Sequence, residues 1–108
     1  MYLAMNRFKV KKDRAEAFED VWLNRDSDLH KMEGFVEFHL LKGPDYDDFV
    51  LYSSHTFWET EDSFKKWTES PEFAKAHAKA RTNKAEPMTL GHPQFEGFNS
   101  VQTIRRAG

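Results

Sequence analysis

The pattern of hydrophobic and polar positions along the chain predicts four strands. The first strand alternates between an apolar and a mixed face, which is typical of a half-buried strand. Gly43-Pro44 and the acidic turn after it separate the second and third strands, which we expect to form a hairpin. Gly97 lies inside the fourth strand and predicts a bulge there. The predicted strands are residues 2–10, 35–41, 49–58 and 94–104.

Three helical segments are predicted between these strands. Asp13 has a glutamate three positions later, which is the spacing of a capping box at the start of the first helix. Thr60 caps a second, short helix, and Ser70-Pro71 starts a third that runs to about Lys84. Residues 82–94 show no period and predict a long loop. The stripe on the first helix comprises Phe18, Val21, Trp22, Arg25 and Leu29.

The element order is β-α-β-β-α-β, with the second helical region split in two. This order is typical of a ferredoxin-like α+β domain, in which helices cover one face of a four-stranded antiparallel sheet. A single domain over residues 1–108 accounts for the whole length. The second strand is apolar on both faces, with Val36, Phe38 and Leu40 on one and Phe35 and Leu41 on the other. We therefore expect a homodimer whose sheets pack face to face.

Composition narrows the classes of function. The 16 basic and 18 acidic side chains give a net charge of -2, which argues against binding nucleic acid through a basic surface. The absence of cysteine excludes a thiol nucleophile and disulfides. No apolar run approaches the roughly 20 residues that span a bilayer, so we expect a cytoplasmic protein without membrane contact. Aromatic residues make up 15% of the chain, and we expect a dimer interface or a flat apolar ligand to cover some of them.

His77 is the first candidate for chemistry. On the predicted third helix it shares an apolar face with Phe73, Ala74 and Ala80, and Arg81 lies one turn further on. A neutral imidazole can ligate a metal. Axial ligation of haem suits this face, because a porphyrin is flat and apolar with anionic propionates at its rim. The alternative is a hydrogen-bonded histidine at the boundary of the core.

Three other positions depart from their local pattern. Asn6 stands among apolar residues of the first strand, where asparagine is depleted. Its amide could hold a bound oxygen species, or Asn6 could occupy a bulge or an edge. Trp67, one turn after Phe64, could press on a porphyrin and distort it, or could pack in the core. Arg25 either extends to solvent or pairs with a ligand carboxylate. The other histidines, which show no metal-site spacing, are His30, His39, His55 and His92.

The combination of Asn6, Trp67 and His77 resembles the IsdG-type haem-degrading monooxygenases of the antibiotic biosynthesis monooxygenase (ABM) superfamily. The resemblance covers nearly the whole chain. Its supporting segments are Glu33-Gly34-Phe35, Phe57-Trp58-Glu59 and the stretch from Phe64 through Ser70-Pro71-Glu72-Phe73-Ala74 to His77. Much of that stretch is shared with other ABM proteins, whereas the trio is the more specific feature.

The resemblance implies a dimeric α/β barrel with haem as both substrate and cofactor. His77 would be the proximal iron ligand, Trp67 would ruffle the porphyrin, and Asn6 would hydrogen-bond near the distal oxygen. Arg81, and less specifically Arg25, would contact the propionates. The implied reaction opens the macrocycle with O2 and electrons and releases iron. A separate reductase or a small-molecule reductant would supply the electrons, because the sequence contains no flavin or nicotinamide motif.

Other classes of function remain compatible with the sequence. A cofactor-free ABM monooxygenase acting on an aromatic or quinol substrate would use the same pocket without a ligating histidine. A haem-binding or trafficking protein would form a stable complex and not turn it over. A dimeric ligand sensor would ordinarily be fused to a DNA-binding segment, which the sequence does not show.

Overall fold

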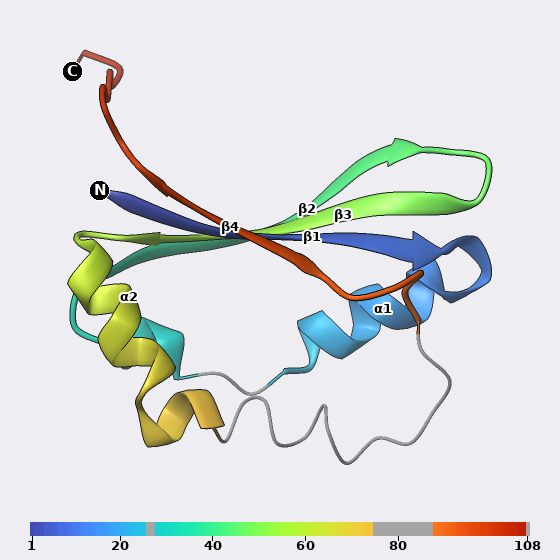
Figure 1. The fold of residues 1–108 in the computed structure, drawn as a ribbon, viewed down its shortest axis with the longest axis horizontal. Coiled ribbons are helices and arrows are strands. Elements are labelled where there is room, and N and C mark those ends of the chain that lie inside the picture. The colour runs from blue at the N-terminus through green and yellow to red at the C-terminus, as the bar shows by residue number, and fades with distance from the viewer. Residues whose placement is uncertain (26–27, 75–87, 108) are drawn as a thin grey trace.

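A computed structural model describes residues 1–25, 28–74 and 88–107. Four antiparallel strands form one sheet in the order β2-β3-β1-β4. Both α-helices lie on the same side of this sheet (Figure 1). The predicted ferredoxin-like arrangement is therefore confirmed. The elements are β1 (Tyr2–Lys11), the 3-10 helix η1 (Lys12–Arg14), α1 (Ala15–Leu23), the 3-10 helix η2 (Leu29–Lys31), β2 (Phe35–Asp45), β3 (Phe49–Trp58), α2 (Glu61–Thr68) and β4 (Gln94–Asn99).

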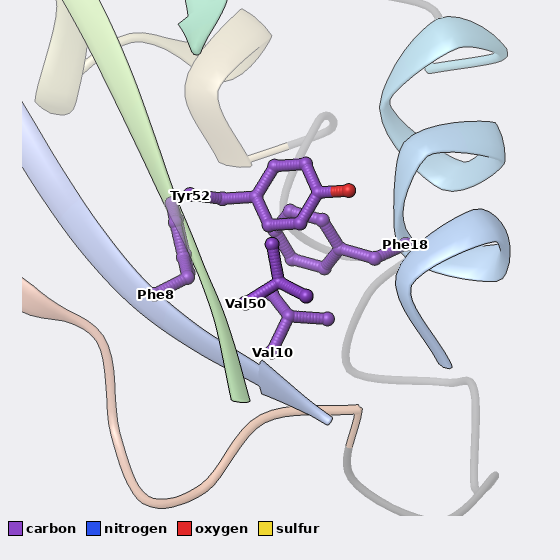
Figure 2. Packing of buried hydrophobic residues seen from close by; sticks show 5 residues of the cluster. All are labelled: Phe8, Val10, Phe18, Val50 and Tyr52. Atoms are coloured by element: carbon purple, nitrogen blue, oxygen red, sulfur yellow. The ribbon is translucent and has the colours of Figure 1, made fainter. Parts of the chain in front are cut away.

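The core consists of two hydrophobic clusters at opposite ends of the helix-covered face. One lies beneath α1, where Phe18 packs against side chains from β1 and β3 (Figure 2). The other lies beneath α2 and is centred on Trp58, which is fully buried. The even-numbered residues of β1 contribute to both clusters, as the alternation predicts. The first cluster comprises Phe8, Val10, Phe18, Val50 and Tyr52, and the second Tyr2, Ala4, Trp58 and Trp67.

The helix caps agree with the sequence only in part. Thr60 Oγ1 accepts a hydrogen bond from the Ser63 backbone N–H at 3.1 Å, and Ser70 Oγ accepts one from Phe73 at 3.2 Å, so both predicted caps are confirmed. The predicted cap at Asp13 is wrong, because Asp13 lies within η1 and α1 starts later without a side-chain cap. Helix α1 ends at Leu23, so Leu29 belongs to η2 and not to the first helix.

Strand β2 differs from the prediction in its length and in its faces. It continues through Gly43-Pro44 to Asp45, with an irregularity in its pairing with β3 between Lys42 and Asp45. A second irregularity, between Phe35 and Glu37, shifts the alternation by one residue. Phe35 therefore lies on the helix-covered face together with Phe38 and Leu40. The prediction that Val36 shares a face with Phe38 and Leu40, opposite Phe35, is wrong.

The C-terminal part of the chain also departs from the prediction. Of the loop predicted at 82–94, residues 82–87 lie outside the described residues. Residues 88–93 form no helix or strand and follow the end of β1, where Leu90 N–H donates to Lys9 O at 2.7 Å and Met88 O accepts from Lys11 N–H at 2.8 Å. Strand β4 ends at Asn99 and not at 104, and its pairing with β1 is regular, so no bulge occurs at Gly97. Glycine is needed there for another reason, since a Cβ would overlap the Tyr2 ring.

No described helix covers the opposite face of the sheet, which is visible as the upper side in Figure 1. Leu3, Met5 and Phe57 lie on this face, as their register requires, and each is partly exposed. Phe98 of β4 adds a side chain that is 45% exposed. None of the described helices is long and apolar enough to cross a membrane.

Candidate functional site

A cavity of about 510 Å³ opens between the sheet and the helices, which is within the usual range of ligand pockets. It lies where the two core clusters are separated, because β1 carries Asn6 between Ala4 and Phe8, and β3 carries Ser54 directly opposite. Seven of its 15 described lining residues are phenylalanine or tryptophan. Its lining residues are Ala4, Asn6, Trp22, Arg25, Leu29, His30, Phe35, Phe38, Ser54, Thr56, Phe64, Trp67, Thr68, Phe73 and Phe95.

Asn6 presents an amide to this cavity. It lies in the middle of the sheet, paired with Ser54 on one side and Phe95 on the other, so its backbone is fixed by two neighbouring strands. Its side chain makes no hydrogen bond to any other residue that the structure describes. An amide carries two N–H donors and an acceptor, which are free here to bind a ligand. Asn6 is therefore not an edge-strand residue and does not occupy a bulge.

Trp67 forms a rigid part of the wall on the helical side. It lies in the last turn of α2 and is 7% exposed. Its ring contacts Trp58 at 6.2 Å between centroids and meets Phe73 edge-on at 5.5 Å. Ser70 Oγ donates to the Trp67 carbonyl at 2.6 Å and fixes the end of the helix. Trp67 is thus a core residue that also faces the cavity, so its two predicted roles are compatible.

Arg25 lies just beyond α1, and its side chain is half-buried. Its guanidinium carbon is 4.2 Å from the centroid of the Trp22 ring. Burial lowers the pKa of Arg25, because the charged form loses hydration. The arginine forms no ion pair with a carboxylate in the described part of the chain. A partly dehydrated cation at a cavity wall, with no counter-ion among the described residues, favours an anionic group on the ligand.

Two predicted site residues, His77 and Arg81, lie outside the described residues. The structure does place Phe73 in the cavity wall, on the helical segment that Ser70 starts. Within residues 1–25, 28–74 and 88–107, no group of three or more acidic or histidine side chains could hold a metal ion.

Several lining residues could not be selected from the sequence. Phe35 and Phe38 share the cavity only because of the irregularity in β2. His30 reaches the wall through η2, for which the helical pattern gave no signal. Ser54 and Thr56 did leave a signal, since two small polar residues occupy successive inward positions of β3, between Tyr52 and Trp58.

The fold and the cavity together define a class: small α+β domains of ferredoxin-like topology with an aromatic ligand site between sheet and helices. The chain belongs to the antibiotic biosynthesis monooxygenase family, whose sequence model matches residues 1–79. It is 31% identical over 93 residues to a heme oxygenase (staphylobilin-producing) of Staphylococcus saprophyticus, covering 85% of this chain and 88% of the relative. It is 33% identical over 79 residues to a heme-degrading monooxygenase of Halalkalibacterium halodurans, covering 73% and 67%.

A solved structure is similar to this fold over nearly the whole chain. The heme-degrader MhuD from Mycobacterium tuberculosis, with two hemes bound in its active site, superimposes with a TM-score of 0.72 at 25% identity. The match covers 96% of this chain and 99% of that protein. The similarity therefore extends over the whole domain, including the strands and helices that form the cavity.

Proposed function

We propose that this protein is a haem-degrading monooxygenase that binds haem as its substrate, opens the porphyrin ring with O2 and electrons, and releases the iron. The observation that carries the proposal is the cavity itself, in which one aromatic space brings together Asn6, Trp67 and Arg25. Relatives named for heme degradation, at 31% and 33% identity, support the choice of substrate.

The described residues fit a haem. A porphyrin is flat and apolar, and the wall offers aromatic rings from α1, α2, β2 and β4. Its propionates require cations, and Arg25 supplies a guanidinium at the wall without an ion-pair partner among the described carboxylates. His77 is the proposed iron ligand and Arg81 a second propionate contact. When bound, the haem iron supplies the centre at which O2 is reduced.

The remaining roles belong to Asn6 on β1 and Trp67 on α2. Asn6, held in the middle of the sheet, would donate a hydrogen bond near the oxygen bound on the distal side. Trp67, held by Trp58 and Phe73, would press on the porphyrin and favour a distorted ring. Distortion exposes a meso carbon of the substrate to oxidation. A separate reductase or a small-molecule reductant would deliver the electrons.

The substrate assignment is tested with one equivalent of haemin, followed in the visible spectrum before and after addition of ascorbate in air, with catalase present. A Soret band that forms and then decays, while a chelator traps ferrous iron, supports the proposal. A band that forms and persists with several electron donors would contradict it and favour haem carriage. If no band forms, the cavity more simply serves an aromatic or quinol substrate of a cofactor-free monooxygenase.

Replacing Trp67 by phenylalanine should leave haem affinity nearly normal and slow ring opening, because the smaller ring no longer reaches the porphyrin. The control is Val50→Ala, which trims a buried side chain in the other core cluster and does not line the cavity. Single-turnover decay of the Soret band would be measured for both variants. We expect slow decay only in Trp67→Phe. Equal rates in the two variants would make Trp67 a packing residue.

We also propose that the protein is a dimer through the uncovered face of the sheet, in the barrel arrangement that the resemblance implies. Leu3, Met5 and Phe57 provide the apolar centre of such an interface. Phe57→Glu should therefore give a monomer, measured as molar mass by light scattering after size exclusion. Leu23→Glu serves as control, since Leu23 is 78% exposed on α1, away from this face. A dimeric Phe57→Glu variant would argue against the interface.

A further inference from the structure

Trp22 has two sets of neighbours, because it packs against the buried cluster under α1 and also lines the cavity. Its ring lies nearly parallel to that of Phe38, with centroids 5.7 Å apart and an angle of 16° between the planes. Phe8 and Phe18 contact the same ring at 5.8 and 6.2 Å at steep angles. Three aromatic contacts from β1, α1 and β2 therefore fix the plane of Trp22.

The Arg25 guanidinium lies over this fixed ring, at 4.2 Å from its centroid. The Arg25 backbone N–H also donates to the Trp22 carbonyl at 3.3 Å, so main chain and side chain are both tied to Trp22. Stacking on an aromatic face leaves the N–H edge of a guanidinium available for a planar, two-pronged contact with a carboxylate. An arginine without this support would lose more side-chain entropy on binding an anion.

We propose that Trp22, backed by Phe38, is a positioning residue that holds Arg25 as the carboxylate-binding edge of the cavity. Through Arg25 it makes the site selective for flat ligands that carry a free carboxylate at that end. The choice of ligand rests on the proposed function, whereas the stacking itself does not. Trp22 acts through Arg25, so its effect on selectivity should vanish when Arg25 is neutralised.

The test has one arm that needs no ligand. In the ligand-free protein the side-chain protons of Arg25 should show an upfield ring-current shift by NMR. This shift should disappear in Trp22→Leu and remain in Val50→Ala. Val50 is the matched control, because it is buried in the same cluster and does not line the cavity. Trp22→Phe keeps an aromatic face in a smaller ring and should retain part of the shift, which also covers the case in which Trp22→Leu fails to fold.

The second arm measures affinity for protoporphyrin IX and for its dimethyl ester, by quenching of tryptophan fluorescence. The dimethyl ester cannot form the charge-assisted contact with Arg25. The wild-type protein should therefore bind the free acid more tightly than the ester, by roughly tenfold or more. Trp22→Leu should lower this preference by about three- to tenfold. Trp22→Phe should lower it less, and Val50→Ala should leave it unchanged. In an Arg25→Gln background, Trp22→Leu should have no further effect on the preference.

Three results would overturn the inference. They are a wild-type preference retained in Trp22→Leu, an equal loss in Val50→Ala, and a Trp22 effect that persists in the Arg25→Gln background. If neither porphyrin binds the wild-type protein, the proposed function fails together with the selectivity for porphyrin carboxylates. The NMR arm then still decides whether Trp22 holds Arg25.

Discussion

Haem bound to the His77→Ala variant should lack the spectrum of a histidine-ligated iron. The reason is that the iron would lose its proposed axial ligand, while the aromatic wall would still bind the porphyrin non-specifically. Turnover should fall to the background rate of free haemin. Soret position and magnetic circular dichroism of the ferric complex would report the ligand directly, and added imidazole should restore part of the ligated spectrum.

The cavity contains its own control for this experiment. His30 also lines the wall, from η2. The His30→Ala variant should keep the wild-type spectrum and rate. If instead His30→Ala loses ligation and His77→Ala keeps it, the axial ligand is His30 and the assignment of His77 is wrong.

The Asn6→Ala variant should bind haem with a normal ferric spectrum but degrade it on the order of 10² times more slowly. This is the usual cost of removing one preorganised donor from a site where charge develops. The donor is well placed for such a role, since neighbouring strands hold Asn6 on both sides and no other described residue hydrogen-bonds its amide. Single-turnover decay in the presence of ascorbate and catalase measures the effect.

Two companion variants separate hydrogen bonding from shape. Asn6→Asp keeps the size of the side chain and removes its N–H donors, so it should be as slow as Asn6→Ala. Thr56→Val removes a hydroxyl from the same cavity at nearly constant volume and should leave the rate close to wild type. Normal turnover in Asn6→Asp would mean that Asn6 only fills space.

The elements with a strong local signal were predictable from the sequence. Alternation in β1 and the caps at Thr60 and Ser70 depend on neighbouring residues, and the structure contains all three. The extra residue in β2 had no such signal, because the shift at Val36 is determined by how β2 pairs with β3. The early end of α1 was missed for a similar reason, since the apolar spacing continues to Leu29 although the helix does not.

The candidate site, like the fold, could be predicted from the sequence only in part. Asn6 could be selected because an amide among apolar strand residues is conspicuous, and the structure places it in the cavity wall. The stacking of Arg25 on Trp22 could not be predicted, because it depends on where α1 ends and on the ring of Phe38 from a distant strand. Roles that require a bound ligand, such as those of His77 and Arg81, stay predictions.

The separation of the core into two clusters has a consequence for the empty protein. Asn6 and Ser54 interrupt the hydrophobic layer in the middle of the sheet, so the two core clusters are not continuous with each other. A flat apolar ligand would complete that layer and raise the melting temperature as its concentration rises above its Kd. A cell that degrades unfolded chains would then keep this protein longest when its ligand is abundant. Supply of the ligand would set the lifetime of the enzyme that consumes it.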